Sequence, residues 1–174
     1  KEIIIDIQKE ASKIENFDIP EIFSSILYPI NTDLINIEKI ISINDSRFLF
    51  CKFPTFGTPN NYLEKLIYLI NNNYIPILTN INNSPLKIKK INELLDIGCL
   101  FDIDIYDFFQ FKNNKSIKII NFLESRGSIL TVSGLSKIEE LLKNLERFSK
   151  LTKIDLDKLK NIYCWENPNL IISS

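Results

Sequence analysis

The chain has 174 residues, of which 45% are hydrophobic and 25% are charged, a composition that suits one globular domain with its own core. Its net charge of −1 argues against nucleic-acid binding, because such proteins usually present a basic face. We expect no membrane span, since no run of about 18 apolar residues occurs, and the start lacks the pattern of a signal peptide.

The first third of the chain is expected to alternate between helices and strands. Residues 2–15 suit an amphipathic helix, a short strand is expected within 19–30, and residues 33–42 suit a short helix or turn. The segment RFLFCKF (47–53) has the nearly continuous apolar pattern of a strand that is covered on both faces. This alternation favours an α/β fold.

The middle of the chain continues the same pattern. Residues 60–72 predict a helix with one apolar stripe made of Leu63, Leu66, Ile67 and Ile70. The strand IPILT (75–79) follows. Ser84 as N-cap and Pro85 at the first helical position then predict a helix that runs to Leu95 and stops near Gly98.

The last part of the chain predicts two further strands and three helices. Strands are expected at 99–105 and 128–133, and helices at 115–125, 136–151 and 155–163. Ser136 and Glu139 are placed as a capping box at the start of the second of these helices. Strands separated by helices of this length imply parallel βα units, either doubly wound or closed as a barrel, in one domain spanning 1–174.

The sequence contains no histidine. This excludes Ser-His-Asp and Cys-His catalysis and histidine-ligated zinc. An enzyme built from this chain would depend on carboxylates, lysine, tyrosine or backbone groups.

The three cysteines, Cys51, Cys99 and Cys164, stand alone in apolar surroundings. Their odd number and unpaired spacing predict reduced thiols and a cytoplasmic location. A catalytic cysteine needs a nearby base or cation, and none is identified, so buried thiols are favoured.

The strand in YIPILTNINN (74–83) ends in residues that are poorly suited to catalysis. Its tip carries Thr79, Asn80, Asn82 and Asn83, which are neither acids nor bases. An amide oxygen can accept a hydrogen bond or weakly ligate Mg²⁺, but it cannot replace imidazole.

Other polar residues have two interpretations each. Asp102 and Asp104 alternate along a strand, so they face one side and could bind Mg²⁺; a polar strand end that caps loops or helices is favoured instead. Arg47 could contact an anion through two hydrogen bonds, whereas a salt bridge with a nearby acid is the favoured alternative.

Two side-chain clusters are interpreted as structural. The aromatic residues Tyr106, Phe108, Phe109 and Phe111 would form an interaction patch if they were exposed, but burial in the core is favoured. The basic cluster, made of Lys87, Lys89 and Lys90, is expected to be a solvated helix face.

Several stretches, in order and at compatible spacing, resemble one family. They are INDSRFLFCKFP (43–54), NNYLEKLIYLINNNYIPILTN (60–80), KINELLDIGCLFDIDI (90–105), FLESRGSILTVSGLSK (122–137) and ENPNLII (166–172). Together they are similar to the C-terminal two-thirds of the PHP-type tyrosine-protein phosphatases of bacterial capsule and exopolysaccharide clusters, the CpsB/YwqE group. The resemblance implies an incomplete or distorted TIM-like (β/α) barrel that lacks the first strands of the family.

The family holds metals at its strand tips, and the chain departs from it there. The resemblance places Asn80 where the family has a metal-binding histidine, and Gly134 and Ser136 where it has an aspartate and a histidine. A family glutamate falls around Asn31 or Thr32. With Ser133, these residues are expected to line a vestigial pocket.

The resemblance and these departures imply a catalytically degenerate protein without a cofactor. It would have a binding, regulatory or structural role related to polysaccharide biosynthesis or tyrosine phosphorylation. A phosphotyrosine protein, a sugar phosphate, another protein or a second copy of the chain would be its partner. The alternative is an active metal-dependent phosphatase or hydrolase that uses Mg²⁺ or Mn²⁺ on Asp33, Asp102 and Asp104.

Overall fold

The computed structural model describes residues 28–30, 40, 42–54, 56–111, 113–133 and 138–172. The helix expected over 2–15, most of the segment 33–42 and the capping residue Ser136 lie outside these ranges. The account below concerns the described residues.

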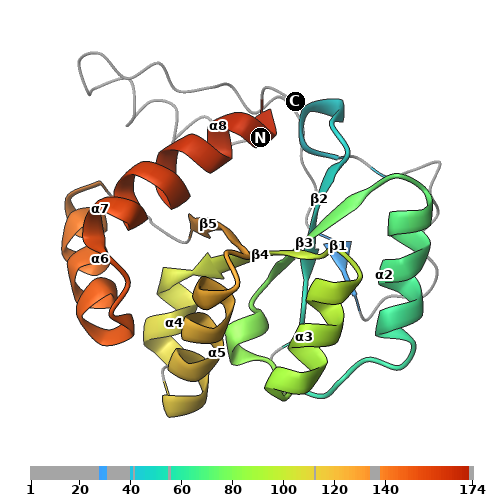
Figure 1. Cartoon of the computed structure of the whole chain (residues 1–174), viewed down its shortest axis with the longest axis horizontal. Coiled ribbons are helices and arrows are strands. Elements are labelled where there is room, and N and C mark those ends of the chain that lie inside the picture. Colours follow the sequence, from blue (N-terminus) through green and yellow to red (C-terminus); the bar gives the residue numbers. More distant parts are fainter. Residues whose placement is uncertain are drawn as a thin grey trace.

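Five parallel strands form one sheet, and their order in the sheet follows their order in the chain. They are β1 (Tyr28–Pro29), β2 (Phe48–Lys52), β3 (Ile75–Thr79), β4 (Leu100–Asp104) and β5 (Ile129–Ser133). Figure 1 shows them side by side in this order. A doubly wound sheet reverses its strand order near the middle, whereas a (β/α) barrel keeps it consecutive. The fold is therefore a segment of a TIM-like barrel, and the predicted strands are confirmed.

Helices connect the strands and continue to the end of the described chain. They are α2 (Tyr62–Asn71), α3 (Ile88–Asp96), α4 (Ile105–Phe111), α5 (Asn114–Ser125), α6 (Ile138–Thr152), α7 (Leu156–Lys158), the π-helix η4 (Leu159–Glu166) and α8 (Asn167–Ile172). A short 3-10 helix, η2 (Ile43–Asp45), precedes β2, and another, η3 (Ile81–Asn83), follows β3. Among the described helices, none has the length and apolar character needed to cross a membrane.

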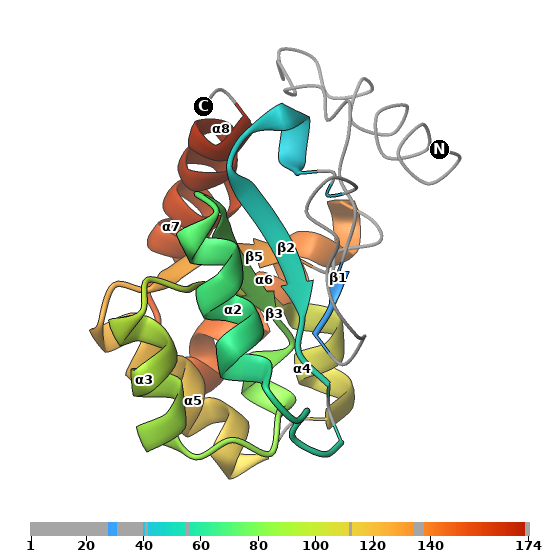
Figure 2. The ribbon, with the colours of Figure 1, turned by 90° about the vertical axis from the view of Figure 1, so that its right-hand side faces the viewer.

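The two faces of the sheet carry cores of different size. Leu78 points to the larger core, which joins the sheet to α2, α3, α5 and α6. Its neighbour Ile77 points to the opposite face and packs in a smaller cluster with Ile43 and Ile171 of α8. In Figure 2, β2 runs downward near the centre of the view, so its C-terminal end lies at the lower side.

Two details of the predicted helices are wrong. Ser84 is not the N-cap of α3: it follows η3, its hydroxyl accepts from the Leu86 N–H at 3.4 Å, and α3 begins only after Lys87. The chain first makes the buried turn η3, and this delays the helix. In α2 the buried residues are Leu66 and Leu69, whereas Ile67 is exposed.

The aromatic segment after β4 forms a helix, α4, which the sequence did not predict. Phe108 is fully buried and its ring centroid lies 4.9 Å from that of Phe148, so the predicted burial is confirmed for this residue. It is wrong for Tyr106 and Phe111, which are 59% and 44% exposed. The helix directs only one side of this segment to the core.

The outer edge of β5 is covered by side chains from the C-terminal helices. The Asn167 amide donates to the Leu130 carbonyl at 2.8 Å, and the Cys164 thiol lies 3.9 Å from the Val132 carbonyl. These two groups occupy carbonyls that a sixth strand would otherwise bind. The ENP segment (166–168) therefore contributes to closing a sheet edge.

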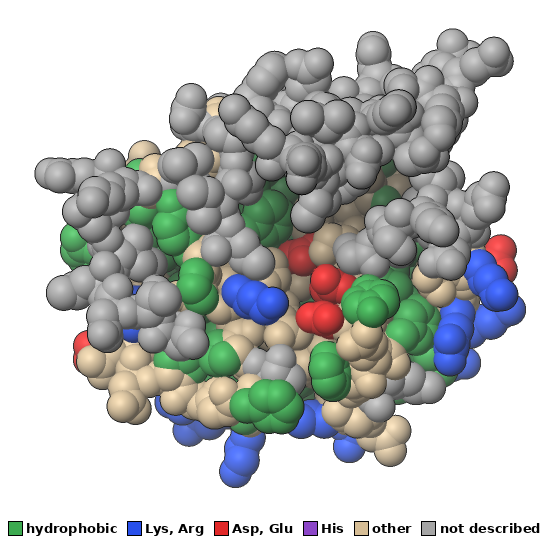
Figure 3. Space-filling view, turned by 180° about the vertical axis from the view of Figure 1, so that it is seen from behind, with side chains coloured by type: hydrophobic (Ala, Val, Ile, Leu, Met, Phe, Trp, Pro, Cys, Tyr) green, Lys and Arg blue, Asp and Glu red, His purple; other side chains and the backbone are tan. Residues whose placement is uncertain are grey.

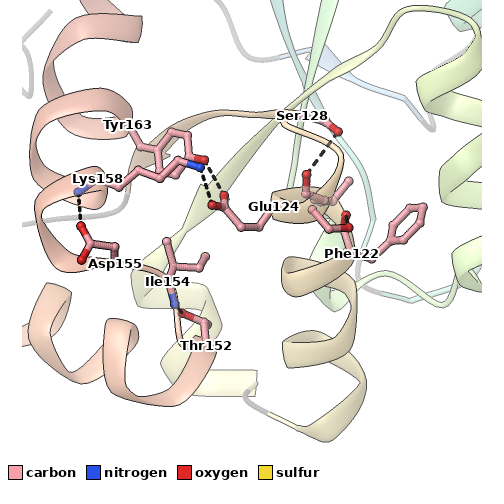
Figure 4. Close-up of polar contacts among 10 residues, drawn as sticks. Phe122, Glu124, Ser128, Thr152, Ile154, Asp155, Lys158 and Tyr163 are labelled. Atoms are coloured by element: carbon pink, nitrogen blue, oxygen red, sulfur yellow. Dashed lines mark hydrogen bonds and ion pairs between the residues drawn. The ribbon is translucent and has the colours of Figure 1, made fainter.

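One carboxylate ties α5 to the C-terminal helices. Lys158 Nζ lies 2.6 Å from Glu124 Oε1, and the Tyr163 hydroxyl donates to Glu124 Oε2. Figure 4 shows Glu124 reaching across from α5 between these two partners. Because Tyr163 is only 3% exposed, this contact fixes the position of η4.

Candidate functional site

The inner face of the sheet, which is the one beneath α8, changes from apolar to polar toward the C-terminal ends of the strands. On β2 it carries Phe48 and Phe50 before Lys52, and on β4 it carries Leu100 before Asp102 and Asp104. In Figure 3, acidic side chains lie beside a basic one near the centre of the view. The C-terminal ends of barrel strands are where such folds place their sites, so these tips form the candidate site.

Asn80, at the tip of β3, is a buried polar residue. It is 3% exposed and adopts a left-handed conformation with φ of 64°, which asparagine tolerates better than most residues. Its amide donates to the Phe53 carbonyl at 3.3 Å, just beyond the end of β2. The side chain therefore bridges two neighbouring strand ends.

The turn after Asn80 is held by a network of amides. Asn83 Nδ2 donates to Asn80 Oδ1 at 3.1 Å, and Asn82 Nδ2 donates to Asn83 Oδ1 at 3.2 Å. Ser116 of α5 also reaches Asn83 Oδ1, at 3.3 Å. The amides at this strand tip are thus structural links between β3, η3 and α5.

Asp102 is enclosed by two hydroxyls from β5. Thr131 Oγ1 lies 2.7 Å from its Oδ1, and Ser133 Oγ lies 2.7 Å from its Oδ2. Burial raises the pKa of Asp102 to about 6, against the opposing effect of these hydrogen bonds, and the nearby Asp104 raises it slightly further. Both oxygens have partners within the protein.

Asp104 and Asp107 form an acidic pair at the edge of the site, beside Lys52. The Asp107 backbone N–H donates to Asp104 Oδ1 at 2.9 Å, so Asp104 caps the first turn of α4. Partial burial and the charge of Asp104 raise the pKa of Asp107, while Lys52 lowers it. The favoured interpretation of Asp104, as a cap on a neighbouring helix, agrees with this contact.

The remaining predicted site residues are distributed as follows. Ser133 lies in the site through its bond to Asp102. Arg47 is exposed at the N-terminal end of β2, about 16 Å from the tips by the length of a five-residue strand. Its role as an anion contact remains a prediction. The other four, Asn31, Thr32, Gly134 and Ser136, lie outside the described residues, as does Asp33.

No group of three or more carboxylate or thiol side chains suited to holding a metal ion gathers within the described part of the chain. Asp102 is occupied by Thr131 and Ser133, and Asp104 accepts from a backbone N–H. These bonds use three of the four carboxylate oxygens of the pair, so Asp102 and Asp104 already serve the fold.

The thiols behave as buried side chains. Cys51 and Cys99 are buried and Cys164 is half-buried, and all three are free. Burial raises the pKa of Cys51 to about 12 and that of Cys164 to about 11. The predicted burial is confirmed for Cys51 and Cys99, whereas Cys164 is only partly buried, and the raised pKa values oppose thiolate formation.

Three residues of the site were missed at the level of sequence. Thr131 could have been found, because it alternates with Ser133 along β5 and so shares its face. Asp107 stands three positions after Asp104, the spacing of an N-terminal helix cap. Lys52 carried no distinguishing pattern.

The NDSR segment (44–47) forms the turn that leads into β2. Asn44 adopts a left-handed conformation with φ of 47°, and the Ser46 hydroxyl accepts from the Phe48 N–H at 3.2 Å. The Arg47 carbonyl accepts from the Ile75 N–H at 2.7 Å and so starts the pairing of β2 with β3. This segment serves the fold at the edge opposite the candidate site.

No model of a known protein family matches the chain, and no curated protein matches it. Among solved structures it is similar to a chain from the crystal structures of YwqE from Bacillus subtilis and CpsB from Streptococcus pneumoniae, described as unique metal-dependent tyrosine phosphatases. The identity is 18% and the TM-score is 0.49. The match covers 73% of this chain and 58% of that one, so this chain spans a little over half of that structure's length.

Proposed function

We propose that this chain keeps a PHP-type scaffold but binds a ligand or partner without hydrolysing phosphate esters at its strand tips. The proposal depends mainly on Asn80. This residue is buried, and its amide donates a hydrogen bond to the Phe53 carbonyl. By the sequence resemblance, this position belongs to a metal-binding histidine. An amide fixed in this way supplies neither a strong metal ligand nor a general base.

The neighbouring carboxylates support the same proposal. Metal-assisted hydrolysis needs side chains that converge on an ion and lower the pKa of its bound water. Asp102 is enclosed by two hydroxyls and Asp104 caps α4, so both are committed to the fold. The chain also has no histidine at any position. Its role would then be binding or regulation, connected by the resemblance to polysaccharide biosynthesis or tyrosine phosphorylation.

The test combines metal analysis with turnover of p-nitrophenyl phosphate. The purified chain is dialysed against Mn²⁺ or Mg²⁺, its metal content is measured, and phosphate release is followed with and without chelator. We expect no tightly held metal and no chelator-sensitive turnover. Two or more bound metals together with metal-dependent release would overturn the proposal.

A double variant, Asp102→Asn with Asp104→Asn, separates the competing function. If a rewired carboxylate site were active, this variant would lose the activity while the folded state remained intact by circular dichroism. If the chain is a binding protein, any residual turnover is a contaminant and stays the same in the variant. The exposed Asp96→Asn substitution controls for the loss of a carboxylate.

A further inference from the structure

A cavity of about 460 Å³ opens between the first turns of α3 and α5. Its lining consists of four lysines and two isoleucines: Lys87, Ile88, Lys89, Lys115, Lys118 and Ile119. In Figures 1 and 2 the two helices run side by side and begin at the same lower end, and basic side chains gather along the lower margin in Figure 3. The lining contains ammonium groups and no carboxylate.

The positive charge of this cavity has the same sign as the N-terminal ends of the two helices that form it. The N-terminus of a helix carries a partial positive charge, so acidic residues normally occupy the first turn. Neither α3 nor α5 has an acid in its first turn. Lysines stand there instead, and no side chain caps the N-terminus of α3. Lysines and helix N-termini carry charge of the same sign, so an anion between the two helices would be attracted by both.

Within the described part of the chain, the cavity lies among few countercharges. Lys90 pairs with Glu93 at 2.7 Å, but neither residue lines the cavity. Of the four lining lysines, none forms an ion pair with a carboxylate in the described part of the chain. Lys115 Nζ donates to the Ser84 carbonyl at 2.7 Å, so one ammonium group is held in a fixed position at the cavity.

The fold brings these lysines together from distant parts of the sequence. Lys87 and Lys89 were expected to be a solvated helix face, but α5 adds Lys115 and Lys118 to the same cavity. The lining also has an apolar part, in which Ile88 is 40% exposed and Ile119 is fully buried. The volume is within the range of small-molecule sites.

We propose that this cavity binds a small phosphate ester, with the doubly charged phosphate among the lysines and the organic group against Ile88. Lysine is a common ligand for phosphate as a point charge, and the N-terminus of α3, which no side chain caps, adds backbone N–H donors, whereas Asn113 caps α5. The assignment does not rest on the proposed function of the strand tips, because none of the strand-tip residues lines the cavity.

The experiment measures binding of butyl phosphate and inorganic phosphate to the full chain at matched ionic strength, by thermal shift and by NMR titration. The test variant is Lys89→Gln with Lys118→Gln, two exposed lysines without hydrogen bonds in the described structure. The control variant is Lys143→Gln with Lys150→Gln, which removes two exposed lysines from α6. Both variants change the net charge equally.

We expect the wild type to bind butyl phosphate more tightly than inorganic phosphate. The test variant should bind the ester about tenfold more weakly, because two charge-assisted contacts are lost, while the control variant binds as the wild type does. Without ligand, the test variant should unfold at the same temperature or about 2 °C higher, since Lys89 no longer opposes the dipole of α3 and fewer like charges surround the cavity.

Three results would overturn the assignment. They are no binding of either compound by the wild type, an equal loss of affinity in the test and control variants, or equal affinity of the wild type for the two compounds. Equal affinity for the two compounds would mean that the organic group makes no contact in the cavity. Metal content and turnover of p-nitrophenyl phosphate, which test the strand tips, are independent of all three.

Discussion

Ser133 Oγ donates a hydrogen bond to Asp102 Oδ2 at 2.7 Å, and so joins the tip of β5 to a buried carboxylate on β4. Burial raises the pKa of Asp102 to about 6 in the folded protein. In the unfolded chain the same group titrates near its ordinary value of about 3.9. The folded state therefore binds this proton more tightly than the unfolded state does.

The Asp102→Asn substitution should remove a specific part of the pH dependence of stability. Since the folded pKa is raised, the contribution of Asp102 to stability is fully present below about pH 4 and is lost as pH rises to about 6. The loss amounts to about 3 kcal/mol for a shift of about two pH units. Urea denaturation of both proteins between these pH values measures it.

The variant should gain stability relative to the wild type as pH rises, because the neutral amide carries no buried charge and can still bond Thr131 and Ser133. The Asp96→Asn substitution, at an exposed position, controls for the loss of a carboxylate. A stability difference that stays constant across the window would show that Asp102 titrates normally.

The Asn80→His substitution should not restore a metal site. It places a larger ring in a buried, left-handed position and removes the bond to Phe53, so we expect a loss of about 1–3 kcal/mol of stability. Metal retention should stay unchanged, because Asp102 already bonds Thr131 and Ser133 and Asp104 bonds the Asp107 N–H. Metal analysis and urea denaturation check both outcomes.

Asn73→His provides the matched control for this substitution. Asn73 has a φ of 68° but is exposed, so it bears the same backbone strain without the buried ring. The difference between the two variants isolates the effect of burial. An Asn80→His variant that is as stable as Asn73→His and retains Mn²⁺ after dialysis would contradict the structural role of Asn80.

The strands could be predicted from the sequence because they are short, mainly apolar runs, and the βα alternation predicts that they are parallel. Their order could not be predicted from the alternation, which fits both a doubly wound sheet and the consecutive order that the structure has. The partners of Asp102 could not be predicted in this way. A register shift between Phe101 and Asp102 changes which residues of β5 lie opposite β4, and no local pattern shows such an irregularity.

The missed and misplaced helices have similar causes. In α4 the aromatic residues are distributed around the helix, so the segment lacks a single apolar stripe. The start of α3 was placed too early because Ser84 and Pro85 form a helix-start pattern that the buried turn η3 overrides. Tertiary packing decided both cases.

The Asn167→Ala substitution should destabilise the protein by about 1–2 kcal/mol. It leaves the Leu130 carbonyl, on the outer edge of β5, without its donor at 2.8 Å. Asn161→Ala, at an exposed position of the same helical segment, is the control and should change stability little. Equal urea midpoints for the two variants would mean that Asn167 does not close the sheet edge.

The Glu124→Ala substitution should be more costly than the loss of a surface ion pair. The Lys158–Glu124 pair is partly exposed and contributes about 0–1 kcal/mol by itself. The Tyr163 hydroxyl, however, lies in a residue that is only 3% exposed and would be left without its acceptor. An unsatisfied buried donor costs about 1–3 kcal/mol, so the total loss should exceed that of the pair alone.

The isosteric Glu124→Gln variant separates these two contributions. Glutamine keeps an oxygen that can accept from Tyr163 while it removes the charge that Lys158 needs, so its loss of stability should be small and should shrink with added salt. Glu146→Ala, on the exposed side of α6, controls for the removal of a glutamate. If Glu124→Ala and Glu124→Gln are equally destabilised in urea, the charge of Glu124, and not its bond to Tyr163, holds η4 against α5.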